Sequence, residues 1–233
     1  MQEETKRIYY SKSEVVDIYD WKRFQRLGGR YVAKKENSAL EELLTLAKID
    51  SASLILDCPV GTGRFIPNLK KFSNNIIAAD ISPSMIEVAK SYGASEYLVC
   101  SADQLPLANE TIDLWVMSRF CFHFEDLSVF FKEASRVLKK NGHLIFDAFN
   151  WSPRSLVPSP FLGGKTFNHP PAELNKILGV HGFEIVKRLP TFFIPTYIST
   201  FIPNFLVEGV ERISDQVAPL AKTKSFYLVK KVE

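Results

Sequence analysis

The chain is poor in cysteine. It holds only Cys58, Cys100 and Cys121 among 233 residues. An odd number of thiols at these wide spacings matches neither a disulfide framework nor the paired ligands of a zinc site. We therefore expect three reduced, buried thiols, no bound metal, and a cytoplasmic protein rather than a secreted one.

Long apolar runs and an excess of one charge are lacking too. No window approaches the roughly 18 uninterrupted apolar residues of a membrane-spanning helix. The start, from Met1 to Arg7, is polar and lacks the apolar core of a secretory signal. The net charge is only +3, and lysine and arginine form pairs rather than blocks. The sequence therefore predicts no transmembrane segment and no nucleic-acid partner.

Hydrophobic residues make up 46% of the chain, which is enough for one large core and indicates a single domain over residues 1–233. Strand-like and helix-like segments alternate along it. The expected strands cover residues 54–58, 76–80, 97–100, 112–118, 143–149, 183–189 and 225–230. The expected helices cover residues 64–72, 83–92, 127–139 and 172–179. Because the strands are almost continuously apolar, this order predicts a doubly wound α/β sheet with helices on both faces.

Three regions fall outside this alternation. Residues 8–46 are aromatic and helix-like, and residues 150–171 form a linker rich in proline, glycine and serine. Residues 190–223 carry several aromatic and aliphatic groups between prolines. For this last region three interpretations stay open: a cap over a substrate pocket, a dimer surface, and a patch that touches lipid.

The most informative segment reads Asp57-Cys58-Pro59-Val60-Gly61-Thr62-Gly63, directly behind the apolar run 54–56. Strand, glycine turn and helix follow one another here, as a nucleotide-binding loop requires. Both glycines allow positive φ and let a ligand approach the backbone. The carboxylate of Asp57 would repel a pyrophosphate but favour the ammonium and sulfonium of S-adenosylmethionine, which carries no phosphate.

Further motifs stand at the ends of the next expected strands. Asp80 lies 19 residues beyond Gly61, where an acid binds ribose hydroxyls in dinucleotide sites. Asp103 follows the third strand and can accept a hydrogen bond from an exocyclic amine such as that of adenine. Ser118 and Arg119 open the loop after the fourth strand, beside cofactor and substrate. A helix cap at Asp80 and a plain polar turn at Asp103 are the alternative interpretations.

Together these motifs resemble the class I S-adenosylmethionine-dependent methyltransferases, in their small-molecule group with a methyltransferase domain of the 11/25 type. The similarity runs over about residues 54–149. The family signature is D/E-x-G-x-G-x-G, and Pro59 replaces its first glycine here. Residues 118–126 are similar to S-x-x-x-H-H-L-x-D, with Phe122 in place of the first histidine. Residues 136–142 resemble the turn R-V-L-K-P-G-G.

The resemblance implies a Rossmann-like sheet of seven strands, mostly parallel, whose last strand is antiparallel and inserted beside the fifth. It implies a helical lid over residues 1–50, a cofactor-binding core over 51–149 and an acceptor-side half over 150–233 with an insertion at 190–223. It also carries cofactor-binding roles to Asp57, Pro59, Gly61, Gly63, Asp80, Ile81, Met85, Ala102, Asp103, Gln104, Ser118, Arg119, Arg30 and Tyr31. In the lid, Arg30 or Tyr31 would meet the methionine carboxylate.

The chemistry implied is in-line transfer of a methyl group to a small-molecule acceptor, leaving S-adenosylhomocysteine. Such a reaction depends mainly on positioning, and a general base is needed only for a protonated acceptor. His123 is the candidate base, and a half-buried histidine between Phe122 and Phe124 is its alternative interpretation. His169, in the linker, is a second and weaker candidate.

Other functions stay open on the sequence alone. The same fold acts on RNA or protein in some families, and a non-catalytic S-adenosylmethionine-binding protein would keep the same motifs. A nicotinamide-dependent oxidoreductase fits less well because the turn lacks G-x-G-x-x-G and begins with an acid. The acceptor atom is not specified, and the protein is expected to be a monomer or a homodimer.

Overall fold

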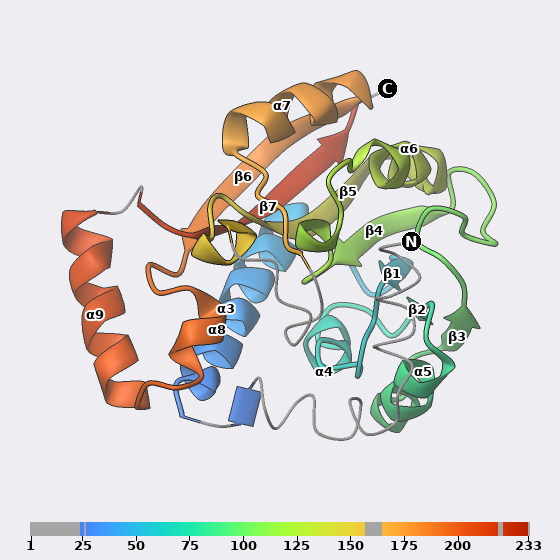
Figure 1. The fold of residues 1–233 in the computed structure, drawn as a ribbon. Coiled ribbons are helices and arrows are strands. Elements are labelled where there is room, and N and C mark those ends of the chain that lie inside the picture. The colour runs from blue at the N-terminus through green and yellow to red at the C-terminus, as the bar shows by residue number, and fades with distance from the viewer. Residues whose placement is uncertain (1–23, 26, 157–164, 219–220, 233) are drawn as a thin grey trace.

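The computed structural model describes residues 24–25, 27–156, 165–218 and 221–232 (Figure 1). Within these residues one sheet of seven strands has the order β3-β2-β1-β4-β5-β7-β6. All neighbouring pairs from β3 to β5 are parallel, whereas β7 runs antiparallel to both β5 and β6. The strands are Ile55–Asp57, Ile76–Asp80, Glu96–Val99, Ile112–Met117, Leu138–Phe149, Phe183–Thr191 and Lys224–Lys231, numbered β1 to β7. The predicted Rossmann-like sheet with an antiparallel last strand is confirmed.

Two separate cores flank the sheet, and the central strands are buried on both sides. Successive residues of β1 show this: Ile55 packs into one core and Leu56 into the other. One core is closed by α6 (Ser128–Val137) and α7 (Pro171–Val180). The other is closed by α3 (Gly29–Ala47), α4 (Ile66–Leu69) and α5 (Pro83–Ala89), as Figure 1 shows.

Short helices complete the described chain. They are the 3-10 turns η2 (Lys90–Tyr92), η3 (Cys121–His123) and η4 (Pro153–Leu156) and the α-helices α8 (Thr196–Ser199) and α9 (Asn204–Val217). No helix among the described residues is long and apolar enough to cross a membrane. Cys58 and Cys121 are buried as expected, whereas Cys100 is half-buried.

The boundary between α6 and β5 differs from the expectation. The helix predicted for 127–139 ends at Val137, and β5 begins at Leu138 rather than at residue 143. Gly142 therefore lies inside a strand and does not stop a helix. A Cβ there would lie 2.8 Å from the Lys139 carbonyl oxygen, so close backbone packing explains this glycine. The left-handed residue is its neighbour Asn141, with φ of 66°.

The region 190–223 contains α8 and α9. In α9, polar side chains face the protein interior and several apolar side chains face outward. Its buried side chains include Glu211 and Ser214, while Leu206, Ile213 and Val217 are exposed. The Glu211 carboxylate accepts the backbone N–H groups of residues 193 and 194, at 2.8–3.0 Å. This helix is therefore anchored by polar contacts, and it presents an apolar face to the outside at one edge of the molecule (Figure 1).

The expected lid lies partly outside the described residues, which begin at Phe24. Its described part is α3, the helix that covers the β5–β7 part of the sheet. The same helix contacts α8 and α9, and the Gly28 N–H donates to the Ile202 carbonyl at 2.8 Å. A Cβ on Gly28 would lie 2.3 Å from the Ser199 carbonyl oxygen. Glycine is thus required where α3 meets the insertion.

Candidate functional site

The glycine turn after β1 is held by the acid at the end of β2. Asp80 Oδ2 accepts the Gly61 N–H at 2.9 Å, and its Oδ1 accepts the Ser82 N–H at 2.9 Å. Both glycines of the turn have positive φ, 55° at Gly61 and 86° at Gly63. A Cβ on Gly61 would meet no atom within 4 Å, so the backbone there faces open space. Gly63 instead packs against α5, where a Cβ would lie 3.0 Å from the Ala89 Cα.

A cavity of about 310 Å³ opens above this turn, at the carboxyl ends of the central strands. This is the edge at which α/β sheets bind ligands. Eleven of the predicted site residues line it: Asp57, Pro59, Gly61, Asp80, Ile81, Met85, Ala102, Asp103, Ser118, Arg119 and His123. They come from four separate loops, so the fold brings together residues spread over some 70 positions.

Four predicted residues do not line this cavity. Gly63 has the packing role just described, and Gln104 is exposed to solvent. Arg30 is exposed and its Nε donates to the Gln25 carbonyl at 3.0 Å. Tyr31 packs against the cluster of Phe24, Val32 and Phe192, and burial, together with the acidic groups of α9, raises its pKa. Neither Arg30 nor Tyr31 is among the described residues that line the cavity.

Asp57 is a buried acid at the floor of the cavity. Only 2% of the residue is exposed, and among the described residues its Oδ2 has no hydrogen-bond partner. Burial raises the pKa of this carboxyl well above its usual value, and the charge of Asp80 adds to the shift, while Arg64 opposes it. An unsatisfied buried carboxyl oxygen that faces a cavity is suited to a cationic donor from a ligand.

The predicted adenine-side residue Asp103 is also constrained. Ser101 donates its hydroxyl to Asp103 Oδ1, which fixes the carboxylate at the cavity wall. Ile81, which is 43% exposed, and Met85 supply apolar surface on the same wall. This part of the cavity therefore combines a fixed acceptor with apolar contacts, as a flat base with an exocyclic amine requires.

Arg64 is a cavity residue that the sequence analysis missed. Its Nη2 lies 2.6 Å from Oε2 of Glu36 on α3. Its guanidinium stacks between two rings, 4.1 Å from the centroid of Phe24 and 4.0 Å from that of Phe65. Arg64 directly follows the glycine turn, so its position was visible in the sequence. Its partner Glu36 stands 28 residues earlier and carries no local signal.

A second missed group is Asp147, near the end of β5. Its Oδ1 accepts the Ser118 hydroxyl at 2.9 Å and the Arg119 N–H at 2.6 Å. Its Oδ2 lies 2.8 Å from Nζ of Lys224, which is buried on β7. The loop that carries Ser118 and Arg119 is thus held from the neighbouring strand.

The far wall of the cavity is aromatic and carries His123. Phe120, Phe124 and Phe130 pack with ring centroids 4.5–4.7 Å apart. His123, in η3, lines the cavity beside them and is half-buried. The wall therefore offers a titratable group within an apolar surface.

His169 lies outside this wall. Its Nε2 is 3.1 Å from the Cys121 carbonyl oxygen and 3.0 Å from that of Phe124. Burial lowers its pKa, opposed by these two contacts. The ring therefore donates to both carbonyls and holds the η3 turn, so it is not available as a base in the cavity.

No group of three or more acidic, histidine or cysteine side chains in the described part of the chain is arranged to hold a metal ion. The site thus consists of a seven-stranded Rossmann-like sheet and a cavity at the point where the strand order reverses. A glycine turn and acids follow β1 and β2. This architecture defines the methyltransferase-like class of α/β proteins.

Comparison with known proteins agrees. The family described as "Methyltransferase domain" matches residues 56–146. An uncharacterized methyltransferase-like protein of Schizosaccharomyces pombe is 39% identical over 98 residues, which are 41% of this chain and 38% of that protein. A malonyl-[acyl-carrier protein] O-methyltransferase of Marinomonas sp. is 32% identical over 61% of this chain and 56% of that protein. The chain thus spans about half the length, or less, of these relatives.

The fold is also that of magnesium protoporphyrin IX methyltransferase from Synechocystis, solved with bound S-adenosylhomocysteine. The TM-score is 0.69 at 15% sequence identity, over 99% of this chain and 100% of that one. Residues 56–146 therefore match a methyltransferase domain, and the chain has the fold of class I S-adenosylmethionine-dependent methyltransferases.

Proposed function

We propose that this protein transfers a methyl group from S-adenosylmethionine to a small-molecule acceptor. The observation that supports it most is that Asp57, which lines the cavity, has a buried carboxyl oxygen with no hydrogen-bond partner among the described residues. S-Adenosylmethionine, when bound, supplies an electrophilic methyl group on a cationic sulfur. Its ammonium group is the kind of donor that Asp57 lacks, and a dinucleotide would bring a pyrophosphate to the same acid instead.

The other cavity residues would bind the remaining parts of this cofactor. Each carboxylate oxygen of Asp80 accepts one backbone N–H. Its further lone pairs would accept ribose hydroxyls. Asp103 would accept from the adenine amine. Arg64 and Arg119 are the cations of the cavity lining, and they would receive the methionine carboxylate. This assignment replaces Arg30 and Tyr31 in that role.

The acceptor would lie against the aromatic wall. Phe120, Phe124 and Phe130 would exclude water and orient an apolar acceptor at the methyl group. His123 lines the same cavity, and we propose that it takes a proton from an acceptor that must lose one. The relatives support small acceptors, since one is named a malonyl-[acyl-carrier protein] O-methyltransferase and another a magnesium protoporphyrin IX methyltransferase.

Two measurements test the proposal. Thermal unfolding with S-adenosylmethionine, S-adenosylhomocysteine and NADH should show stabilisation by the first two alone, about 2.7 kcal/mol at 100 times the dissociation constant. Methyl-labelled S-adenosylmethionine is then incubated with panels of carboxylic acids, phenols and amines. Label should appear in at least one product. Binding without transfer to any panel would indicate a non-catalytic protein, and stabilisation by NADH alone would contradict the proposal.

A further inference from the structure

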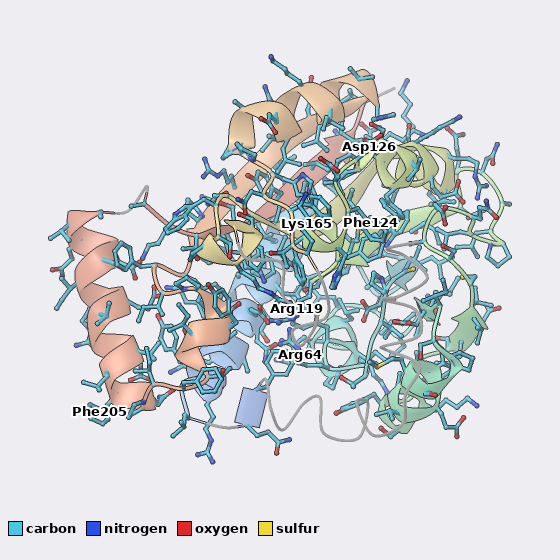
Figure 2. All side chains as sticks on the ribbon, in the orientation of Figure 1. Arg64, Arg119, Phe124, Asp126, Lys165 and Phe205 are labelled. Carbon is cyan, nitrogen blue, oxygen red and sulfur yellow. The ribbon has the colours of Figure 1, made fainter. Side chains whose placement is uncertain are left out.

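A buried glutamate stands behind both cavity arginines. Glu36 of α3 is fully buried, and its Oε1 lies 3.1 Å from Nη1 of Arg119 while its Oε2 lies 2.6 Å from Nη2 of Arg64. The two arginines follow different strands and reach the cavity from different loops. Figure 2 shows them side by side near the middle of the molecule. One carboxylate from outside the cavity lining therefore sets the direction of both guanidinium groups.

A third cation, Lys224, joins this cluster. Lys224 Nζ lies 2.8 Å from Glu36 and 2.8 Å from Asp147. Three cations, Arg64, Arg119 and Lys224, are thus paired with two carboxylates. Of these three described cations, Arg64 and Arg119 line the cavity. An anionic group of a ligand in the cavity would meet their guanidinium groups.

The backbone of Arg119 points to the same conclusion. Its φ is 56°, a left-handed conformation that side-chain-bearing residues adopt rarely. It is held at both ends, since its N–H donates to Asp147 and its guanidinium pairs with Glu36. Such conformations persist only where the surroundings enforce them, and they gather at ligand sites.

We infer that Glu36 is a positioning residue, which aims Arg64 and Arg119 at the carboxylate end of the cofactor. The inference rests on the proposed function, because it requires a ligand with an adenosine part and an anionic amino-acid part. Ion pairs with a shared buried carboxylate fix two long side chains before the ligand arrives, which lowers the entropy lost on binding.

The test compares two ligands on the full chain by calorimetry. S-Adenosylhomocysteine has the amino-acid end, and 5′-methylthioadenosine has the adenosine and the thioether without it. In Glu36→Gln we expect S-adenosylhomocysteine to bind about tenfold or more weakly, since charged hydrogen bonds are lost or misdirected. Binding of 5′-methylthioadenosine should stay within about twofold, because the adenosine contacts are untouched.

Two further variants guard the result against misfolding. Glu36→Gln takes a shared carboxylate from Arg64, Arg119 and the buried Lys224, so the double variant Glu36→Gln/Lys224→Met removes a cation together with the carboxylate. We expect the same selective loss in it. Glu41→Gln is the matched control, because Glu41 lies on the same helix and pairs with Lys71 outside the cavity lining. It should leave both affinities unchanged.

Equal weakening of both ligands in the Glu36 variants would overturn the inference, because it would show a merely structural role. Unchanged binding of S-adenosylhomocysteine would overturn it as well. Neither result touches the proposed function, which is tested on the unaltered chain by its binding of S-adenosylmethionine and by methyl transfer.

Discussion

Asp80 and Gly61 are joined across 19 residues: the aspartate Oδ2 accepts the glycine N–H at 2.9 Å. The acid that would bind the ribose therefore also fixes the turn that would receive the rest of the cofactor. Folding and ligand binding share this carboxylate.

This sharing predicts the behaviour of Asp80→Ala. The substitution leaves the N–H groups of Gly61 and Ser82 without their partner, so the free energy of unfolding should fall by about 2 kcal/mol or more. Stabilisation by S-adenosylhomocysteine should disappear at the same time. Denaturant unfolding with and without the ligand measures both.

Asp113→Ala is the matched control for that experiment. Asp113 also accepts a backbone N–H, that of Leu54 at 2.8 Å, and pairs with Lys139, but it does not line the cavity. Its loss should lower stability and leave the ligand effect intact. If Asp80→Ala kept its response to S-adenosylhomocysteine, its role in the cavity would be disproved.

Asp57 sets a pH dependence whose sign follows from its raised pKa. Below the ordinary carboxyl pKa both folded and unfolded chains hold the proton. Between that value and the raised value of the folded state, the folded chain binds more protons, so this group lowers stability as pH rises. Each unit of the rise corresponds to about 1.4 kcal/mol.

Asp57→Asn should therefore stabilise the ligand-free protein at neutral pH and weaken binding of S-adenosylhomocysteine strongly. Thermal unfolding from pH 5 to 8 should show the gain of the variant growing with pH. A variant that is less stable than the unaltered chain at pH 7 would contradict the placement of Asp57 as an unsatisfied buried acid.

His123→Gln tests the candidate base. If His123 takes a proton from the acceptor, turnover should fall by about two orders of magnitude, while the affinity for S-adenosylhomocysteine changes by less than about twofold. His181→Gln is the control, since His181 caps the end of α7 away from the cavity lining. Unchanged turnover in His123→Gln would remove this residue from the mechanism.

His169 should act on stability rather than on binding. Burial lowers its pKa, so below the ordinary histidine value of 6.5 the unfolded chain binds more protons and stability falls on acidification. His169→Gln removes this part of the acid sensitivity and weakens the bonds to the Cys121 and Phe124 carbonyls. We expect a flatter pH–stability curve below pH 6.5 and a lower maximum. A curve parallel to that of the unaltered chain would exclude this role.

The strands and their order were predictable because apolar runs, glycine turns and a helix cap each act over a few residues. Ser82 illustrates this, since its side chain accepts the Met85 N–H at 3.4 Å at the predicted start of α5. The junction of α6 and β5 was not predictable, because the pairing of Leu138 with Ile112 continues the strand through a polar, basic segment. Pairing across the sheet outweighed the local signal.

The candidate site divides in the same way. Asp57, Asp80 and Asp103 stand at strand ends, which the sequence marks. Glu36 and Asp147 are brought to the arginine loops only by the packing of α3 on the sheet and by the antiparallel pairing of β5 with β7. Contacts between residues so far apart in the chain leave no periodic or local pattern to read.

In α9, the residues that attach the helix to the domain are different from those that it exposes at the surface. Its inward side holds the helix through Glu211, whose carboxylate binds two backbone N–H groups and lies 3.4 Å from Lys222. Its outward side, with Leu206, Val210 and Ile213, contributes little to that attachment. Substitutions on the outward side can therefore vary what the helix meets without loosening its hold on the domain. The outward side of α9 can therefore change in evolution while the inward contacts of Glu211 stay the same. Related chains that keep these contacts are free to differ in their outward side chains.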